Sequence, residues 1–387
     1  MATSIYGAHI VSPGLDLPGG HIAIGRDGTI TSVDEEGGES SRGSGEDAFD
    51  ATGLLAVPGF IDIHTHGAAG ADVSDGGAGS VATVARAKLR EGVTTFLPTT
   101  MSLPHEATLD ALDRIAAYMA SPEPDAAQIP GLHLEGPYLN PRCAGAQNPD
   151  FIRPPDLAEL RTYFERAPIR LISLAPELPG ATEAIALCRE RGAVVSLAHT
   201  AATHQEVVAA IGAGARHLTH FGNQMSPLHH RAIGALGTGL LDDRLSLEVI
   251  ADTIHLAPEM LALTFNLKAR DQIFVITDSM AASGIGDGSF DLGGLAVTVR
   301  DGQARLADGT LAGSTLAMNL GLAHVRAATS LPLREIVATT SLNQARALGL
   351  EHLGRIAPGF RADIVLLDDA FRVRAVFVGG QLRHRAG

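Results

Sequence analysis

The most constraining feature of this 387-residue chain is a regular alternation of short apolar runs with longer amphipathic segments. Eight runs have strand length and composition: FIDIH, TTFLPTT, GLHLEG, LISLAPE, VVSLAHT, HLTHFGN, LEVIADTIH and IFVITDS. Helix-length patterns lie between them, for example at residues 80–92, 182–192 and 203–214. Strands that alternate with helices form parallel sheets, because each crossover must carry the chain back to the same edge. Eight such units predict an α/β protein with a (β/α)8 TIM barrel.

A doubly wound open sheet is the alternative architecture for the same alternation. That fold commonly carries a Gly-x-Gly-x-x-Gly turn after its first strand, and no such motif follows FIDIH here. The barrel is therefore the favoured interpretation.

The two ends of the chain differ from its middle in their sequence pattern. Residues 1–56 contain short β-like runs broken by Gly and Asp, and residues 355–387 repeat this pattern. We predict that these two segments pair into one small β-sandwich domain and that residues 57–354 form the barrel. The polar segment 35–47 is expected to be an exposed loop.

Charge and composition exclude several classes of partner. The chain has 29 Lys and Arg against 43 Asp and Glu, for a net charge of -14, whereas nucleic acids and anionic membranes attract basic surfaces. No run approaches the roughly 18 apolar residues of a membrane span. Cys143 and Cys188 are far apart and show no metal-type spacing. We expect a soluble cytoplasmic protein with reduced thiols, no nucleic-acid partner and no membrane partner.

The first apolar run ends in a His-x-His pair, His64 and His66. Side chains at positions i and i+2 of a strand lie on one side, so both imidazoles can grip the same divalent ion. A buried pair bonded to backbone carbonyls is the alternative, and the dipeptide alone does not decide between them.

Four more polar residues follow other apolar runs, and the active sites of barrels gather at the carboxyl ends of the strands. They are Glu135, His199, His220 and Asp278. Each has a structural alternative: a loop contact for the glutamate, core hydrogen bonds for the histidines and a helix cap for the aspartate. These alternatives would have to coincide at all four positions. A mixed nitrogen and oxygen site, suited to zinc or another borderline transition metal, is the simpler interpretation.

The motifs together resemble those of the amidohydrolase superfamily and, within it, of the N-acetylglucosamine-6-phosphate deacetylase family. The resemblance runs from PGFIDIHTHG through GLHLEGPYLN, SLAHTAAT, THFGNQMS, ADTIHLAPE, ITDSMAASG and LAGSTLAMN to RIAPGFRADIVLLD. It implies hydrolysis of the acetamide of N-acetyl-D-glucosamine 6-phosphate, which releases acetate and D-glucosamine 6-phosphate.

The resemblance also implies roles for the polar residues. Glu135, His199 and His220 would hold the main catalytic metal with a water molecule. His64 and His66 would hold a second ion, with Glu135 as the bridge, so that each subunit binds one or two ions of zinc or iron. Asp278 would take a proton from the water and deliver it to the leaving amine.

The resemblance further implies a substrate site and a homodimer, because the arginine that meets the phosphate can come from a neighbouring subunit. The implied substrate-binding residues are Gln147, Asn223, Gln224, Arg231, His255, Ser314 and Thr315. Gln147, Gly222 and Gln224 depart from the usual pattern of the family. An N-acetylgalactosamine 6-phosphate, an unphosphorylated N-acetyl sugar or another N-acyl amine is therefore an alternative substrate, and a non-catalytic barrel scaffold is the alternative function.

Overall fold

The computed structural model describes residues 4–35, 48–74, 76–77 and 79–387. Its central sheet has the strand order β15-β14-β13-β12-β11-β10-β9-β6, and every neighbouring pair is parallel. The strands are β6 (Phe60–Thr65), β9 (Val93–Thr100), β10 (Leu132–Glu135), β11 (Ile169–Leu174), β12 (Val194–Leu197), β13 (His217–Leu218), β14 (Ser246–Ile250) and β15 (Ile273–Ile276). These are the eight predicted runs, in the predicted order.

The sheet closes into a barrel between its first and last strands. A parallel bridge joins Thr65 to Ser279, and the backbone N–H of Asp278 donates to the carbonyl of His64 at 2.9 Å. The barrel prediction is therefore confirmed, and the open sheet is wrong.

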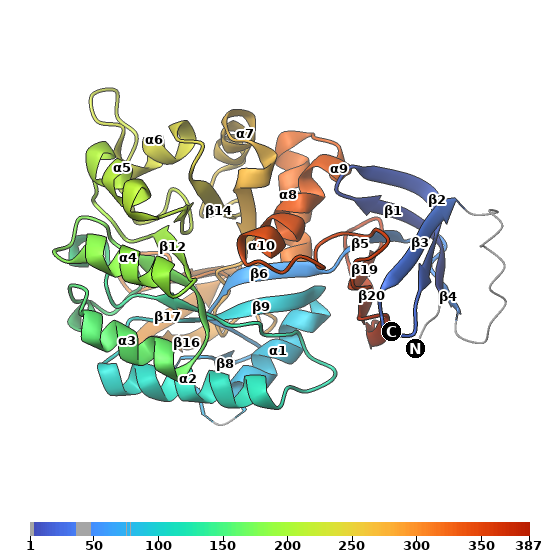
Figure 1. Cartoon of the computed structure of the whole chain (residues 1–387), viewed down its shortest axis with the longest axis horizontal. Helices are drawn as coiled ribbons and strands as arrows, with labels where there is room; N and C mark the ends of the chain where they lie inside the picture. The colour runs from blue at the N-terminus through green and yellow to red at the C-terminus, as the bar shows by residue number, and fades with distance from the viewer. Residues whose placement is uncertain (1–3, 36–47, 75, 78) are drawn as a thin grey trace.

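Helices surround the barrel on its outer side (Figure 1). They are α1 (Ser80–Arg90), α2 (His105–Ala120), α3 (Leu157–Arg166), α4 (Ala181–Glu190), α5 (His204–Ala213), α6 (Gly234–Leu241), α7 (Pro258–Leu267), α8 (Met318–Thr329), α9 (Leu333–Ile336) and α10 (Leu342–Ala347). Short 3-10 turns are η1 (Pro141–Cys143), η2 (Pro149–Phe151), η3 (Arg270–Gln272) and η4 (Val337–Thr340). The predicted helices at 80–92, 182–192 and 203–214 appear as α1, α4 and α5. No helix in the described ranges has the length and apolar character needed to cross a membrane.

Alternate residues of each barrel strand enter different cores, which explains why the strands are apolar on both faces. Along β15, Ile273 and Val275 join the large core beneath the helices, whereas Phe274 and Ile276 join a smaller cluster inside the barrel. The same alternation along β14 and β10 turns Glu248 and Glu135 inward. The strand pattern thus positions two carboxylates in the barrel interior.

Both chain ends contribute to a second sheet, seen beside the barrel in Figure 1. Its order is β21-β20-β19-β5-β1-β2-β3, with β4 paired to β1. The strands are β1 (Ser4–Ser12), β2 (Leu15–Ile24), β3 (Ile30–Glu35), β4 (Ala48–Asp50), β5 (Leu55–Pro58), β19 (Ile364–Leu367), β20 (Val373–Val378) and β21 (Gln381–Arg385). Of the segment expected to be an exposed loop, residues 36–47 lie outside the described residues.

Two small antiparallel elements lie on loops that follow barrel strands. One pairs β7 (Gly67–Ala68) with β8 (Ala71–Asp72), and the other contains β16 (Gly288–Leu292), β17 (Leu295–Arg300) and β18 (Gln303–Arg305). Leu292 and Val297 of the latter pack with Met101, just after β9, and Met280, just after β15. This hairpin therefore covers part of the carboxyl-terminal mouth of the barrel.

Candidate metal centre

The predicted metal ligands and Asp278 all lie at the carboxyl end of the barrel. Glu135 is the last residue of β10, whereas His199, His220 and Asp278 each lie two residues beyond a strand. These three have left-handed backbones, with φ of 45°, 33° and 50°. Non-glycine residues rarely adopt this conformation, which costs about 1–3 kcal/mol where the surroundings enforce it. The turns that aim these side chains inward are therefore held by the surrounding fold.

Glu135 lies between two pairs of histidines. Its Oε2 atom is 3.5 Å from Nε2 of His64 and 3.2 Å from Nε2 of His66. Its Oε1 atom is 3.4 Å from Nε2 of His199 and 3.1 Å from Nε2 of His220. Two trios that share Glu135 thus have ligand atoms within 4.8 Å of one another. Bonds of about 2.05 Å at tetrahedral angles separate ligand atoms by roughly 3.3 Å, so the spacing suits zinc-sized ions.

Hydrogen bonds at the other ring nitrogens direct the metal-binding atoms. Nδ1 of His66 lies 3.0 Å from the carbonyl of Thr99, and Nδ1 of His199 lies 2.8 Å from the carbonyl of Cys143. A carbonyl only accepts, so each Nδ1 carries the proton and each Nε2 presents a lone pair to Glu135. Within each pair the two Nε2 atoms are 3.2 and 3.1 Å apart. Facing lone pairs at this distance require a proton or a cation between them, and the donor set fits a divalent ion.

The electrostatics of the cluster favour positive charge. Burial lowers the pKa of His64, but the carboxylates of Glu135 and Asp278 outweigh it and raise the pKa well above its usual value. Burial also lowers the pKa of His66, but Asp278 and Glu135 outweigh it and raise the pKa to about 9. Burial raises the pKa of Asp278, but His64 and His66 lower it to about 2. Protons and metal ions therefore compete for the same atoms.

Asp62 and Lys88 form a buried network behind the centre that the sequence analysis missed. Asp62 Oδ2 lies 3.1 Å from Lys88 Nζ and accepts hydrogen bonds from the hydroxyls of Thr65 at 2.7 Å and Thr277 at 2.5 Å. Its Oδ1 atom accepts from the backbone N–H groups of His64 at 3.3 Å and Thr277 at 3.2 Å. Asp62 thereby ties the end of β6 to the end of β15, which carry the histidine pair and Asp278. The available signal was an acidic residue inside an apolar run and a lysine on the apolar side of a helix pattern.

A second polar group lies inside the barrel beneath the centre. Glu248 of β14 is fully buried, 3.5 Å from Nδ1 of His64 and 3.5 Å from Nδ1 of His217. Burial raises its pKa, but His217 and His64 outweigh burial and lower the pKa to about 2. His133 lies 2.7 Å from Ser173 Oγ, and burial followed by the charge of His64 lowers its pKa to about 3. His133 is therefore neutral and structural.

A pocket opens over the centre at the mouth of the barrel. Its lining includes the residues His66, Glu135, Gln147, His199, His220, Asn223, Gln224, His255 and Asp278, with the apolar side chains of Met101, Leu292 and Leu311. Eight of the predicted metal-binding and substrate-binding residues, together with Asp278, thus share one cavity wall. The mixture of polar and apolar groups suits a small molecule with an apolar methyl and several hydroxyl groups.

Gln147 and His255 are oriented by neighbours within this pocket. Gln147 Nε2 donates to Glu135 Oε2 at 2.9 Å, while its Oε1 accepts from the backbone N–H of Ser102 at 2.7 Å. Its amide thus supports the bridging carboxylate. Nδ1 of His255 lies 2.7 Å from Oδ2 of Asp252, a residue that the sequence analysis did not single out. This contact leaves Nε2 of His255 free to meet a ligand.

Three predicted substrate residues lie outside the lining of this pocket. Arg231 is exposed in the loop between β13 and α6, which projects from the barrel near α5 (Figure 1), and it lines a different hollow with His204. Ser314 Oγ donates to the carbonyl of Thr277 at 2.5 Å, and Thr315 Oγ1 donates to that of Gly302 at 2.8 Å. Both hydroxyls are therefore committed to the backbone, and Gly313 is the residue of that loop that reaches the pocket.

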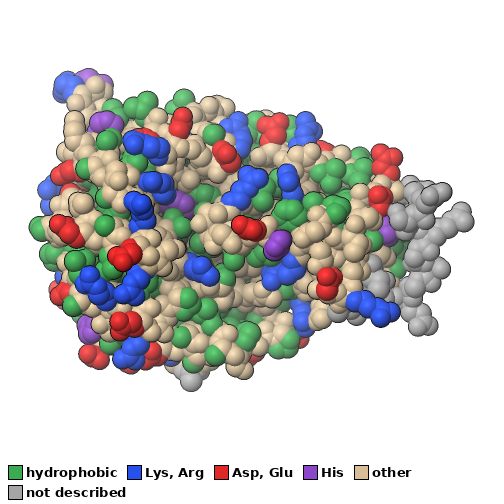
Figure 2. Space-filling view, in the orientation of Figure 1, with side chains coloured by type: hydrophobic (Ala, Val, Ile, Leu, Met, Phe, Trp, Pro, Cys, Tyr) green, Lys and Arg blue, Asp and Glu red, His purple; other side chains and the backbone are tan. Residues whose placement is uncertain are grey.

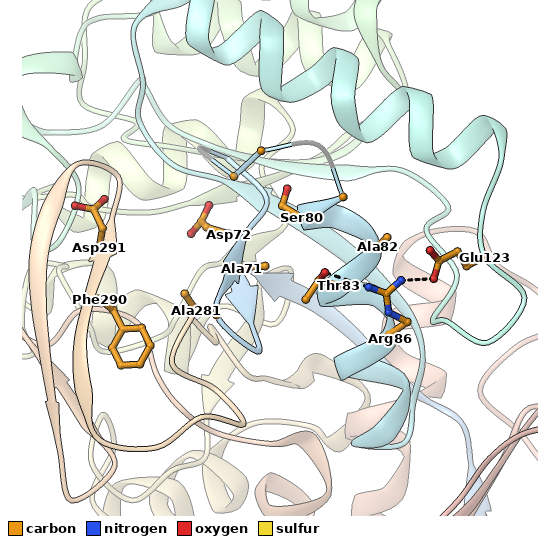
Figure 3. A pocket seen from close by; sticks show the side chains of 14 residues that line it. Ala71, Asp72, Ser80, Ala82, Thr83, Arg86, Glu123, Ala281, Phe290 and Asp291 are labelled. Carbon is orange, nitrogen blue, oxygen red and sulfur yellow. Dashed lines mark hydrogen bonds and ion pairs between the residues drawn. The ribbon is translucent and has the colours of Figure 1, made fainter.

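Among the described residues, the groups of His, Cys, Asp and Glu that could hold a metal ion are the two that share Glu135. On the face drawn in Figure 2, acidic and basic side chains are interspersed rather than separated by sign. Figure 3 shows a second hollow beside the start of α1, whose lining includes Asp72, Asp291, Glu123 and Arg86. Arg86 already donates to Glu123 and to Thr83, which lies 3.1 Å away. None of the predicted site residues is among the described residues that line this hollow.

The fold and the site together define a class of protein: a parallel (β/α)8 barrel with a candidate divalent-metal centre at the carboxyl ends of its strands. Residues 55–383 match the model of the amidohydrolase family. The chain belongs to the amidohydrolase family and, within it, groups with the N-acetylglucosamine-6-phosphate deacetylases. The resemblance stated from the sequence motifs is confirmed.

The relatives agree in both sequence and structure. An N-acetylglucosamine-6-phosphate deacetylase of Lysinibacillus sphaericus is 35% identical over 360 residues, which cover 92% of each chain. An N-acetylgalactosamine-6-phosphate deacetylase of Escherichia coli O157:H7 is 40% identical over 331 residues, covering 85% of this chain and 87% of the relative. A variant of the Mycobacterium smegmatis enzyme, solved with N-acetyl-D-glucosamine-6-phosphate, superimposes with a TM-score of 0.91 at 30% identity and covers 98% of this chain and 99% of its own.

Proposed function

We propose that this protein is a metal-dependent deacetylase that hydrolyses N-acetyl-D-glucosamine 6-phosphate to D-glucosamine 6-phosphate and acetate. The observation that carries the proposal is the position of Glu135 between two histidine pairs, with Asp278 beside one of them. This constellation occurs in a chain whose relatives at 35% and 37% identity are named as N-acetylglucosamine-6-phosphate deacetylases.

The chain supplies the groups that such a hydrolysis needs. Glu135, His199 and His220 would hold one ion, and His64 and His66 would hold a second against the same glutamate. When bound, such ions lower the pKa of a water molecule and polarise an amide carbonyl. Because its pKa is about 2, Asp278 is a carboxylate at neutral pH and can accept a proton from the attacking water. The protonated Asp278 then delivers that proton to the leaving amine.

Substrate recognition divides between the pocket and a neighbouring subunit in this proposal. His255, Asn223 and Gln224 line the pocket and would meet the sugar phosphate. Arg231 would reach the phosphate of the substrate that is bound in the pocket of the partner protomer. Arg231 is exposed and lies outside the pocket of its own chain, so it would meet a phosphate only in the pocket of a second subunit, which is why we include a homodimer in the proposal. Arginine suits this contact because its guanidinium fork binds phosphate oxygens in pairs. We also propose that the metal is zinc or iron and that the protein is cytoplasmic. The barrel domain would span residues 57–354.

A second candidate substrate is the galactosamine epimer. The relative with 40% identity is named as an N-acetylgalactosamine-6-phosphate deacetylase. Gln147 also binds Glu135 and the Ser102 backbone, which leaves sugar discrimination to other pocket residues.

The decisive experiment is steady-state acetate release by protein reconstituted with zinc or with iron. The substrates are both N-acetyl-hexosamine 6-phosphate epimers and N-acetyl-D-glucosamine without phosphate. A preference for N-acetyl-D-glucosamine 6-phosphate supports the proposal, and a preference for its epimer selects the second candidate. Activity that is absent after reconstitution with either metal, or independent of the phosphate, would contradict it.

A further inference from the structure

Glu248 is a buried carboxylate with no hydrogen-bonding partner among the described residues. Its side chain is fully buried on β14, and neither of its oxygens accepts a hydrogen bond within standard geometry. Two imidazoles flank it, with Nδ1 of His64 at 3.5 Å from Oε2 and Nδ1 of His217 at 3.5 Å from Oε1. A buried carboxylate is strongly destabilising unless its neighbours compensate for the lost water.

Among the described residues, the imidazole of His64 has an unsatisfied nitrogen on the side that lies against Glu248. Its Nε2 faces Glu135 and His66, whereas its Nδ1 is buried and has no hydrogen-bonding partner in the described part of the chain. A neutral imidazole that presents Nε2 to a cation must carry its proton on Nδ1. The carboxylate of Glu248 lies on this side of the ring, with Oε2 at 3.5 Å from Nδ1.

The other ligands of the centre do not have a carboxylate in this position. His66 and His199 direct Nδ1 at backbone carbonyls, at 3.0 and 2.8 Å. Nδ1 of His220 has no hydrogen-bonding partner among the described residues. Of the four histidines of the proposed centre, Glu248 therefore lies against Nδ1 of His64 only, and His64 belongs to the pair that would hold the second ion.

We propose that Glu248 is a positioning residue that holds His64 in its ligand orientation and sets the affinity of the His64–His66 half of the centre. It leaves the half formed by His199 and His220 unaffected. The inference rests on the proposed metal centre. Carboxylates that orient ligating histidines are commonly worth about 10–100-fold in metal affinity, so the expected effect is confined to one of two ions and lies in that range.

The test is a Glu248→Gln substitution, which keeps the shape of the side chain and removes its charge. Metal-free protein is titrated with zinc against a competing chelator, and the two dissociation constants are obtained separately. We expect the first ion to bind within about threefold of wild type and the second to bind about 10–100-fold more weakly. Glu159→Gln is the control, because it removes a partly buried carboxylate that lies on the outer helix α3 and pairs with Arg153 rather than with a ligand of the centre.

A structural role for Glu248 would shift both constants together or change the unfolding temperature without splitting them. If the variant fails to fold, NMR of the zinc-loaded wild type with ¹⁵N-labelled histidine replaces it. The inference expects His64 to carry a slowly exchanging Nδ1 proton. Equal constants in wild type and variant, a wild type that binds a single ion, or an unprotonated Nδ1 on His64 would overturn the inference. Acetate release would persist in each of these cases. Failure of the inference about Glu248 is therefore distinguishable from failure of the proposed function.

Discussion

The buried ammonium of Lys88 gives the sharpest stability prediction of this structure. Its Nζ atom lies 3.1 Å from Asp62 Oδ2 and 2.8 Å from Glu91 Oε2, and the side chain is fully buried. Substitution of Lys88 by methionine preserves most of the volume but leaves two carboxylates without their cation. Loss of one partner from a buried ion pair typically destabilises a protein by about 3–5 kcal/mol.

The size of the effect can be converted into a melting temperature. Unfolding entropy of about 2.1 cal/mol/K per residue, over 387 residues, amounts to roughly 0.8 kcal/mol/K for a single transition. A loss of about 3–5 kcal/mol should therefore lower the melting temperature by about 4–6 °C. Circular dichroism or calorimetry measures this shift directly.

Arg86 is the matched control for Lys88, because it lies on the same helix and also pairs with a glutamate. Its side chain and that of Glu123 are 42% and 43% exposed, so Arg86→Met should cost about 1 kcal/mol or less. The melting temperature should then fall by about 1 °C. Equal shifts for the two variants would refute the argument that burial makes the difference.

The destabilisation caused by Lys88→Met has a predictable pH dependence. Burial raises the pKa of Glu91 even in the presence of Lys88, and without the ammonium it rises further. A carboxyl group whose pKa is raised in the folded state favours folding at low pH, and this advantage disappears as the pH rises. The deficit of Lys88→Met should therefore be smaller at pH 5 than at pH 8, and a deficit that grows on acidification would contradict this reasoning.

Three further predictions concern the site and its backbone. Asp278→Asn should retain its metal but lose about 10²–10⁴-fold in turnover, and near-normal turnover would exclude the assigned proton transfer. Arg231→Ala should raise KM for phosphorylated substrates while kcat is unchanged, whereas an unchanged KM would show that it does not meet the phosphate. Gly354→Ala should destabilise the fold by about 2 kcal/mol or more, because φ is +82° and a Cβ would lie 2.6 Å from the backbone Cα of Leu342. Gly53→Ala, with φ of +77° but open space, should cost only about 1 kcal/mol, and equal melting temperatures for these two variants would contradict the steric argument.

Local patterns predicted the barrel well because they reflect burial along each strand. Both faces of a barrel strand are covered, so runs such as the IFVI of β15 are apolar throughout and stand out between amphipathic helices. The positions of His199 and Asp278 were also readable, since polar residues just after such runs must lie at the carboxyl end of the barrel. Their roles in binding and catalysis remain predictions.

Other features could not be read from local patterns. Lys88 occurs in a helix pattern, where lysine is usually solvated, yet its partner Asp62 lies on strand β6. Glu248 is a single acidic residue within an apolar run, and only the barrel interior places it against His64. A register shift in the pairing of β6 with β9 lets Asp62 face the outer helix while His64 faces the interior.

The sequence by itself determined the order of the strands, the closed parallel sheet, the family and the set of candidate ligands. Hydrophobic periodicity and strand-end motifs carry that information locally. Only the tertiary structure decided that Glu135 lies between two histidine pairs, that Gln147 supports it and that Arg231 stands apart from its own pocket. These contacts join residues from separate β/α units, so their distances depend on how the barrel closes rather than on any local pattern.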